Sequence, residues 1–532
     1  MPLSRHFVTR LILTAFSVSC CFAGGASLAF SQNVLTYHNS TLRSGLNSSE
    51  TALTPSNVNS ASFGKLFTLS VDGLVDAEPL YLSAVPIPGN GTHNLVIVAT
   101  EHDSVYAFDA DTGSPIWHIT TLKSGETPSD DRGCSQVTPE IGITSTPTIR
   151  PTGSNAVIYT VAMSKDSSGD YHQRLHALNA ETGSEIYKGP VDITAKFPGT
   201  GDNSSGGDVV FDPAQYKERS GLLLTGGVVY LAWASHCDIR PYTGWIMGYS
   251  ATTLAQQSVI NVTPNGNEGA IWGAGGGLTA DNLGSIFFLD ANGIFDTALK
   301  SGFPSSGDYG NAFIRLTTSG GLAVADYFEM DNGVTESEGD VDLGSGGAIL
   351  LAPMKDASGN TWDLAAGAGK DGNLYLVNRN SMGKFNSGSN KIYQELSGAL
   401  PGGIWSSPAF SGSKLYFGPV GQPILAFQFK NAKLLTTPVA KTSNAFAYPG
   451  ATPSISSNNG ANAIVWAAEN TNPAVLHAYN ATNLQELYNT NQAADSRDHF
   501  GAGNKFITPM IANGKVYVGT TNGVGVFGLL PK

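Results

Sequence analysis

Charged and imidazole side chains stand in short polar segments that directly adjoin strongly apolar runs of this sequence. Glu140 lies in "PEIGITSTP", and Lys370 follows "LAAGAG". A charge beside a buried strand normally has a partner there, because burying an unpaired charge costs free energy. Carboxylates, an ammonium and imidazoles that converge on one cavity can hold a hard cation or transfer protons. The candidate catalytic residues in these segments are Glu140, Lys370, His236 and Asp238.

A second group of residues could contact a bound cofactor. In "EGAIWGAGGG", the glycines around Trp272 allow backbone or a planar ligand to approach closely. The candidate cofactor-binding residues are Trp272, Glu101, His102, Asp103 and Arg174. Structural roles stay open for all of these residues, since charged groups can pair with one another and a tryptophan can wedge between packed units. The spacing defines no set of metal ligands, because "DASGNTWD" and "DDRG" lack the twelve-residue pattern of a calcium loop.

The elements that must position these residues are short β-strands joined by tight turns. An alternating apolar strand, a small polar turn and a second strand recur, as in "VYAFDADTGSPIW" and "LHAYNATNLQELY". Each copy follows a small-residue strand and a strongly apolar one, such as "TSTPTI" and "AVIYTVAM". These patterns predict units of four strands. The equivalents of Asp109 in eight copies are Asp109, Asn179, Ser250, Thr317, Asn378, Gln428, Asn480 and Gly528.

Four-stranded units of this kind must stack on neighbours to cover their edges and apolar faces. The sequence therefore predicts an all-β fold, an eight-bladed β-propeller of four-stranded blades. The last copy has three strands, so we expect "GKLFTLSV" near the N-terminus to supply the fourth and close the ring. Loops that enter the first strand of a blade, and loops between its second and third strands, open on one end of such a ring. The candidate residues would line a funnel there.

The repeat also carries a resemblance to a known family. The turn "DADTGSPIW", with weaker copies at "NAETGSEIY" and "NATNLQELY", resembles the repeat of quinoprotein alcohol dehydrogenases and their non-catalytic relatives, the PQQ-repeat superfamily. The segment "ETALTPSNVNSASFGKLFTLSVDG" is similar to the segment that enters the eight-bladed propeller of that group. Some of its members bind pyrroloquinoline quinone and Ca²⁺ and oxidise alcohols or sugars. Others have the fold without the cofactor and act as interaction surfaces.

The chain departs from the enzymes it resembles at two places. Those enzymes place a disulfide of two adjacent cysteines over the quinone, and this chain has no adjacent pair beyond residues 1–31. It also lacks the C-x-x-C-H motif of a c-type haem. Two functions follow as alternatives. The protein is either an oxidoreductase that acts on alcohols or sugars with pyrroloquinoline quinone and Ca²⁺, or a cofactor-free scaffold for a protein or glycan partner. We expect a monomer.

The sequence predicts a signal peptide over residues 1–31, because Arg5 and Arg10 precede a short apolar run there. This run is too short for a membrane span, so the protein is expected in the periplasm or outside the cell. A leader at 32–63 and the propeller at 64–532 complete the predicted organisation. Cys134 and Cys237 remain after cleavage and predict a disulfide, with two buried free thiols as the alternative.

The composition agrees with this assignment. Charged residues make up only 13% of the chain, and 63 of its 532 residues are glycine, which is typical of many short strands and turns. The formal net charge is −13, and the sequence has no cluster of Lys and Arg. Nucleic acids and anionic lipid surfaces are therefore excluded as expected partners.

Overall fold

The computed structural model describes residues 33–531, so the predicted signal peptide lies outside the described residues. The described part is an all-β protein, as predicted. Its helices are the single-turn α1 (Gly333–Glu338) and the short 3-10 segments η1 (Tyr37–Asn39), η2 (Gly273–Gly275), η3 (Leu343–Ser345), η4 (Thr490–Gln492) and η5 (Ala494–Ser496). Within residues 33–531, no helix has the length and apolar character needed to cross a membrane.

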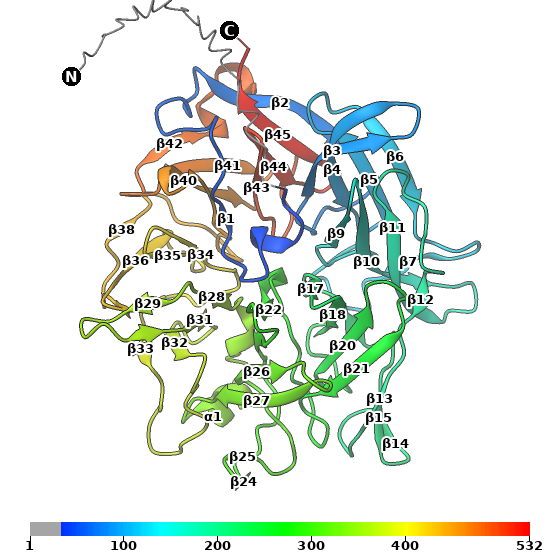
Figure 1. The fold of residues 1–532 in the computed structure, drawn as a ribbon, viewed down its shortest axis with the longest axis vertical. Helices are drawn as coiled ribbons and strands as arrows, with labels where there is room; N and C mark the ends of the chain where they lie inside the picture. Colours follow the sequence, from blue (N-terminus) through cyan, green and yellow to red (C-terminus); the bar gives the residue numbers. More distant parts are fainter. Residues whose placement is uncertain (1–32, 532) are drawn as a thin grey trace, which may run out of the picture. The chain divides into compact units, whose positions relative to one another are not determined.

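Most strands form antiparallel sheets of four, built from strands that follow one another along the chain. Figure 1 shows these sheets in chain order around a centre. The first sheets are β3 (Leu80–Ile87), β4 (Gly91–Ala99), β5 (Ser104–Asp109), β6 (Pro115–Thr120); β9 (Thr148–Thr152), β10 (Asn155–Lys165), β11 (Tyr171–Asn179), β12 (Val191–Asp192); β17 (Leu223–Thr225), β18 (Val228–Ala232), β20 (Trp245–Ser250), β21 (Gln256–Asn261); and β22 (Thr279–Ala280), β23 (Ile286–Leu289), β26 (Phe313–Thr317), β27 (Ala323–Phe328).

The second half of the chain repeats this plan. Its sheets are β28 (Ile349–Leu350), β31 (Leu364–Ala368), β32 (Leu374–Asn378), β33 (Gln394–Leu396); β34 (Ala409–Ser411), β35 (Lys414–Phe417), β36 (Leu425–Lys430) with β37 (Lys433–Leu434) and β38 (Ala440–Lys441); β39 (Ser454–Asn458), β40 (Ala461–Glu469), β41 (Val475–Asn480), β42 (Glu486–Asn489); and β43 (Met510–Ala512), β44 (Lys515–Gly519), β45 (Gly523–Leu529), β2 (Phe63–Ser70).

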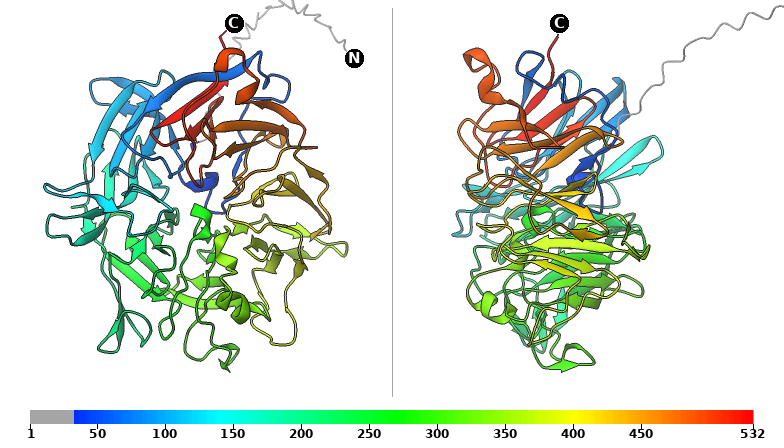
Figure 2. Two further views of the ribbon diagram at one scale, coloured as in Figure 1. Left: turned by 180° about the vertical axis from the view of Figure 1, so that it is seen from behind. Right: turned by 90° about the vertical axis from the view of Figure 1, so that its left-hand side faces the viewer.

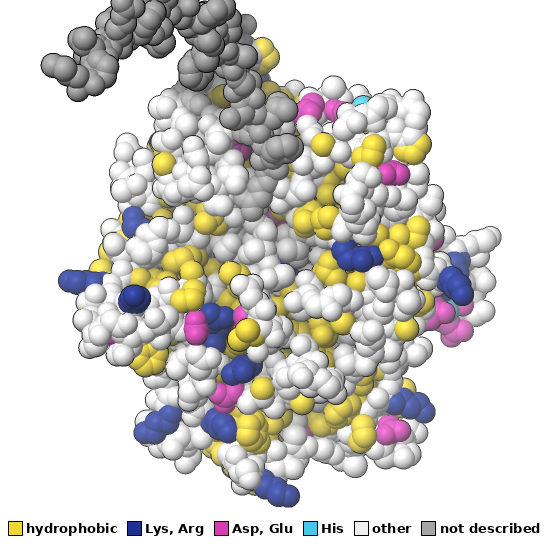
Figure 3. All heavy atoms as spheres, viewed as in Figure 1, with side chains coloured by type: hydrophobic (Ala, Val, Ile, Leu, Met, Phe, Trp, Pro, Cys, Tyr) yellow, Lys and Arg dark blue, Asp and Glu magenta, His cyan; other side chains and the backbone are white. Residues whose placement is uncertain are grey.

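The remaining strands are short and lie at sheet edges or in loops. They are β1 (Leu46–Asn47), β7 (Thr127–Asp130), β8 (Glu140–Ile141), β13 (Lys196–Pro198), β14 (Ser204–Ser205), β15 (Asp208–Val210), β16 (Tyr216–Lys217), β19 (Ala234–Ser235), β24 (Leu299–Lys300), β25 (Phe303–Pro304), β29 (Met354–Lys355) and β30 (Thr361–Trp362). On the face drawn in Figure 3, charged side chains are scattered over several sheets, with no large basic patch.

The strand "GKLFTLSV" pairs with the C-terminal end of the chain. In the antiparallel ladder between β2 and β45, Phe63 lies opposite Leu529 and Ser70 opposite Gly523. Both views of Figure 2 place the early blue strand beside the red C-terminal strands. The two ends of residues 63–529 therefore share one sheet.

The repeated turn is built by its aspartate. Oδ1 of Asp109 accepts hydrogen bonds from the backbone N–H groups of Asp111 at 2.9 Å and Thr112 at 2.7 Å, which fixes the chain reversal after β5. Gly113 has φ +76°, a conformation that favours glycine. The strand that follows carries Trp117, whose Nε1 donates to the carbonyl of Ala180 in the next sheet at 2.9 Å. The turn and its tryptophan thus serve the contact between sheets.

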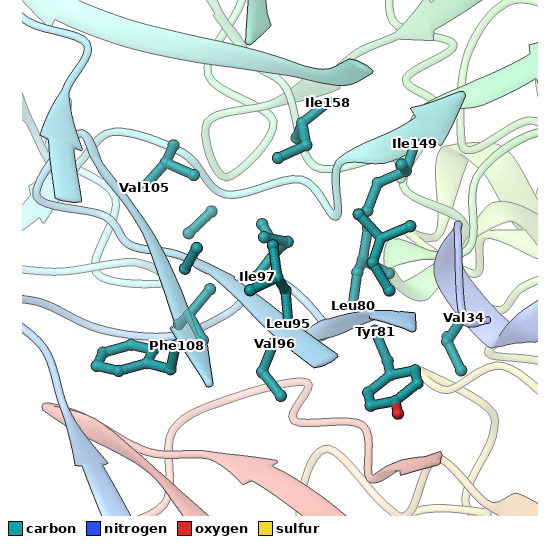
Figure 4. Close-up of a cluster of buried hydrophobic side chains, with 14 of the residues drawn as sticks. Val34, Leu80, Tyr81, Leu95, Val96, Ile97, Val105, Phe108, Ile149 and Ile158 are labelled. Atoms are coloured by element: carbon teal, nitrogen blue, oxygen red, sulfur yellow. The ribbon is translucent and has the colours of Figure 1, made fainter. Parts of the chain in front are cut away.

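Apolar side chains fill the space between neighbouring sheets. Figure 4 shows one such cluster, in which Leu80, Ile97 and Val105 of the first sheet lie near Ile149 and Ile158 of the second. All five are at most 2% exposed. Because each sheet packs on both faces, its central strands read as continuous apolar runs in the sequence.

An N-terminal segment, residues 34–47, contacts the inner edge of one sheet after another; we call it the inner strap. Its hydrogen-bonding partners lie in or next to the first strand of each sheet. The contacts join Val34 to Tyr81, Leu35 to Ile149, Thr36 to Leu222, Thr41 to Ala280, Leu42 to Leu350, Ser44 to Phe410, Gly45 to Ile455 and Asn47 to Ile511. Sequence analysis predicted a leader here and did not predict these contacts.

Arg43 anchors the inner strap at the centre of the molecule. Its side chain is 0% exposed. The guanidinium donates to the carbonyls of Leu278, Tyr37, Gly221 and Leu222 at 3.0–3.1 Å, and to a strap hydroxyl at 2.7 Å. Every N–H group of this buried guanidinium donates a hydrogen bond within the protein, so no donor is left for a ligand. Arg43 therefore has a structural role.

Candidate functional site

Loops at the centre of the molecule line a pocket, which we call the central pocket. Most of its residues come from loops that precede the first strand of a sheet, and two follow a second strand. Its lining is Gln136, Arg219, Asp238, Trp272, Ala274, Asp342, Ser345, Lys370, Trp405, Tyr448 and Phe506. These are the two kinds of loop on which the sequence placed a funnel.

One wall of the central pocket carries a carboxyl–ammonium group. Nζ of Lys370, in the loop after β31, lies 2.6 Å from Oδ1 of Asp340 and 3.2 Å from Oδ1 of Asp342. The side chain of Asp342 is only 7% exposed. Burial raises the pKa of Asp342 to about 8, although the charge of Lys370 lowers it. A carboxyl group that titrates near neutral pH can accept or donate a proton.

Asp238 approaches the central pocket from the loop after β19. Its Oδ1 accepts hydrogen bonds from the hydroxyls of Ser235 at 2.8 Å and Tyr242 at 2.9 Å. The residue before it, Cys237, forms the predicted disulfide with Cys134. This confirms the predicted pairing and excludes two free thiols. The disulfide ties the loop before β8 to the loop that presents Asp238.

The lining of the central pocket also combines a guanidinium with aromatic rings. Cζ of Arg219 lies 4.6 Å from the ring centroid of Phe506. Nζ of Lys217 lies 5.0 Å from the centroid of Trp272 and donates to Oε1 of Gln136 at 3.1 Å. Flat apolar faces beside cations suit a planar or ring-shaped anionic ligand.

The site residues predicted from the sequence do not include Arg219, Lys217 or Phe506. A signal for the first two exists, since the charged run Lys217-Glu218-Arg219 directly precedes an apolar strand in a charge-poor chain. Phe506 carries no such signal, because an aromatic residue before a strand is more often part of the core.

Comparison with known proteins places this architecture. The PQQ_2 family model, described as outer membrane protein assembly factor BamB, matches residues 75–233. The structure is similar to quinohemoprotein alcohol dehydrogenase from Comamonas testosteroni, at 13% identity over 93% of this chain and 80% of that one, with a TM-score of 0.59. It is also similar to a europium-containing methanol dehydrogenase, at 12% identity over 94% and 98% of the two chains, with a TM-score of 0.61.

The fold is that of the PQQ-repeat β-propellers, as the sequence predicted. A third similar structure is the quinohemoprotein alcohol dehydrogenase ADHIIG from Pseudomonas putida HK5, at 12% identity over 94% and 81% of the chains, with a TM-score of 0.60. No curated protein matches this sequence. The structural similarities, at identities of 12–13%, establish the fold of this PQQ-like propeller. Its chemistry must be argued from its own side chains.

Three of the predicted site residues, Lys370, Asp238 and Trp272, line the central pocket of the propeller. His102 and Glu140 lie elsewhere and pair with each other, with 2.9 Å between Nδ1 and Oε1. Arg174 is buried in another network, where it lies 2.8 Å from Glu126 and 2.7 Å from an aspartate. These three residues form contacts between loops and strands of the propeller rather than with the pocket.

Two predicted carboxylates are buried behind the loops. Oε2 of Glu101 accepts hydrogen bonds from the N–H of Gly142 and the hydroxyl of Thr144, both at 2.9 Å. Burial raises the pKa of Glu101, and the adjacent charge of Asp76 raises it further. Burial likewise raises the pKa of Asp103, which is 0% exposed. Neither residue lines the central pocket.

His236 is 2% exposed, and neither ring nitrogen has a hydrogen-bond partner within residues 33–531. Burial lowers its pKa to about 3, with the charge of Lys217 as the second cause. The ring is therefore neutral at physiological pH. Within the described residues, no group of three or more His, Cys, Asp or Glu side chains is arranged to hold a metal ion.

Proposed function

We propose that this PQQ-like propeller is a quinoprotein-type oxidoreductase that oxidises alcohols or sugars at the central pocket. The observation that carries this proposal is the placement of Asp342 and Lys370, with their carboxyl and ammonium atoms 3.2 Å apart, in a pocket with aromatic walls. Oxidation of an alcohol to a carbonyl removes the hydroxyl proton and a hydride from carbon. A carboxylate in such a pocket can take the proton.

Each pocket residue has a role in this scheme. Ionised Asp342 accepts the proton of the substrate hydroxyl. The ammonium of Lys370 favours the ionised form of Asp342 and stabilises negative charge that develops on the substrate oxygen. The aromatic side chains of Trp272, Trp405 and Phe506 exclude water and offer faces on which a sugar or planar ring can stack.

The donor set fits a quinone better than a metal. Pyrroloquinoline quinone is planar and anionic, and the wall with Arg219, Trp272 and Phe506 supplies a cation and flat faces for such a group. When bound, the quinone accepts the hydride. We assign no calcium ligand, since the described residues contain no cluster of acidic or imidazole side chains arranged for a metal, and no step above depends on one.

We also propose that the propeller has eight blades and is closed by the ladder between β2 and β45. Sequential four-stranded sheets and the sharing of one sheet by both ends of residues 63–529 support this arrangement. In this organisation, the leader at 32–63 supplies the inner strap, and the propeller occupies 64–532. When the ring is closed in this way, the N-terminal and C-terminal strands pair in one sheet. No edge strand is then left unpaired where the first and last blades meet.

We propose export to the periplasm or the outside of the cell, with residues 1–31 as the signal peptide. The disulfide between Cys134 and Cys237 supports an oxidising compartment. Cell fractionation and N-terminal sequencing of the purified protein test this proposal. A chain that keeps residues 1–31 and stays with cytosolic markers contradicts it.

The test of the proposed activity combines binding with turnover. The purified protein is examined for quinone absorbance and metal content, then supplied with pyrroloquinoline quinone, Ca²⁺ and an artificial dye acceptor across a panel of alcohols and sugars. We expect dye reduction that falls about 100-fold or more in Asp342→Asn, because general bases contribute rate factors of this size. Lys370→Gln should also lose activity. Arg240→Gln is the matched control, since Arg240 pairs with Asp202 outside the pocket.

Absence of both quinone binding and dye reduction contradicts the oxidoreductase proposal. Unfolding temperatures close to that of the parent protein are required of both pocket variants, because loss of fold would also abolish turnover. A non-catalytic scaffold that binds a protein or glycan is the second candidate. The match of residues 75–233 to a family model described as an assembly factor favours it, and retention of a partner without any dye reduction would support it.

A further inference from the structure

Arg219 is a buried cation without a hydrogen-bond or ion-pair partner among the described residues. The residue is 3% exposed, and its Nη2 atom is inaccessible and lacks a hydrogen-bond partner. Within residues 33–531, its guanidinium makes no hydrogen bond and no ion pair with any other side chain or carbonyl. Arg43 and Arg174 are buried to a similar extent, and both have full sets of partners. Arg219 differs from them in lining the central pocket.

The guanidinium is held firmly in this position. The guanidinium packs against the backbone of Gly275, where an added Cβ atom would lie 2.5 Å from Nη1 of Arg219. The ring of Phe506 lies on the guanidinium at 4.6 Å from its centroid. A planar fork fixed between a glycine and an aromatic face is preorganised for a ligand, because little side-chain entropy is lost on binding.

Nearby acidic groups do not neutralise Arg219. Asp76 and Glu218 are within electrostatic range, but neither is within ion-pair distance. Burial raises the pKa of both carboxyl groups, which favours their uncharged forms. Lys217 adds a second positive charge beside them. An anion bound in the central pocket would therefore find a guanidinium that has no ion-pair partner among the described residues.

We propose that Arg219 binds a carboxylate of the ligand in the central pocket, and that the substrates are hydroxy acids or sugar acids. This inference rests on the proposed function for the pocket and specifies its substrate class. Guanidinium and carboxylate form paired N–H···O hydrogen bonds of matching geometry. An acid anchored on Arg219 shares the pocket with Asp342 and Lys370, where its hydroxyl group would react. A carboxylate of a bound quinone offers the same chemistry.

Calorimetry on the purified full chain tests this proposal. D-Gluconate, D-glycerate and D-galacturonate are titrated without quinone, beside their neutral counterparts glucose, glycerol and galactose, and pyrroloquinoline quinone is titrated separately. We expect at least one acid to bind at least about tenfold more tightly than its neutral counterpart. A difference of this size corresponds to one charge-assisted hydrogen bond. Arg219→Gln should lose that preference and Arg219→Lys should restore part of it, while Arg240→Gln should leave it unchanged.

The two sources of carboxylate give different results. If the affinity for the acids depends on Arg219, the site binds the substrate. If only the affinity for pyrroloquinoline quinone depends on Arg219, the site binds the cofactor. Equal affinity for acids and neutral counterparts, or no binding of any acid or of the quinone, overturns the proposal. Unchanged affinity in Arg219→Gln overturns it too.

Stability provides a readout that separates ligand binding from a structural role. Removal of an unpaired buried charge should leave the unfolding temperature of Arg219→Gln at or above that of the parent protein. A marked decrease would assign Arg219 to the scaffold and overturn the proposal. If the acids bind through Arg219 and no dye is reduced, the oxidation fails while the carboxylate site stands. If hydroxy acids or sugar acids are oxidised equally by Arg219→Gln and the parent, the carboxylate site fails and the oxidation stands.

Discussion

The ammonium nitrogen of Lys370 lies between two carboxylates, 3.2 Å from Oδ1 of Asp342 and 2.6 Å from Oδ1 of Asp340. Asp340 is largely exposed, whereas Asp342 is buried in the wall of the central pocket. One cation therefore serves two acids in different environments. Burial raises the pKa of the inner acid to about 8, so its protonation changes at mildly alkaline pH.

The activity should increase with pH in the range around 8. Asp342 acts as a base only when it is ionised, and its pKa of about 8 means that ionisation is completed above that pH. We expect kcat/KM for dye reduction to rise between pH 6 and pH 9. Because the charge of Lys370 lowers the pKa of Asp342, Lys370→Gln should move the rise to higher pH in any residual activity. A kcat/KM that does not change with pH in the parent protein would contradict the role of Asp342 as the base.

Arg43 should contribute strongly to stability through the inner strap. Arg43→Met removes five hydrogen bonds and leaves the carbonyls of Gly221, Leu222 and Leu278 buried near the hub of the propeller. We expect a loss of about 3–5 kcal/mol in the free energy of unfolding, measured by denaturant titration. Arg240→Gln, at an exposed ion pair, should cost less than about 1 kcal/mol. Equal losses in the free energy of unfolding for Arg43→Met and Arg240→Gln would contradict the anchoring role of Arg43 in the inner strap.

Glu126 and Arg174 should make the stability depend on acidic pH. Burial alone would raise the pKa of Glu126, but hydrogen bonds from Arg174, a backbone N–H and Ser164 lower it to about 2. A folded-state pKa below the unfolded value gives stability that is present above about pH 4.3 and is lost as pH falls toward 2. Glu126→Gln should cost about 3 kcal/mol at pH 7 and little at pH 2, by denaturant titration at each pH. A cost independent of pH would contradict this linkage.

Much of the fold could be predicted because each sheet carries its own signal. The turn after Asp109 combines a side-chain acceptor with a glycine four positions later, and its degraded copies mark the third strand of successive sheets. The pairing of β2 with the C-terminus followed from counting strands. The inner strap escaped prediction, because most of its contacts use backbone groups and depend on where eight separate strands meet.

The central pocket was predicted only in part. Lys370 and Asp238 stand out in the sequence as charges beside apolar strands, and both line the pocket. His102 and Glu140 have the same signal, but they satisfy each other at 2.9 Å instead. Sequence spacing cannot separate these outcomes, because the tilt of each sheet decides whether a loop residue points to the centre or to the neighbouring loop. Arg219 was not selected, although its charged run lies before an apolar strand in the sequence.

The disulfide between Cys134 and Cys237 should stabilise both the fold and the pocket. It closes a loop of 103 residues, which corresponds to about 4–5 kcal/mol in the chain-entropy treatment. Cys134→Ser/Cys237→Ser should lower the free energy of unfolding by up to this amount. It should also weaken ligand binding at the pocket, because Cys237 precedes Asp238 on the tethered loop. Denaturant titration and calorimetry measure the two effects, and the parent protein under reducing conditions should match the variant. A variant with unchanged stability and affinity would show that the loops hold their positions without the crosslink.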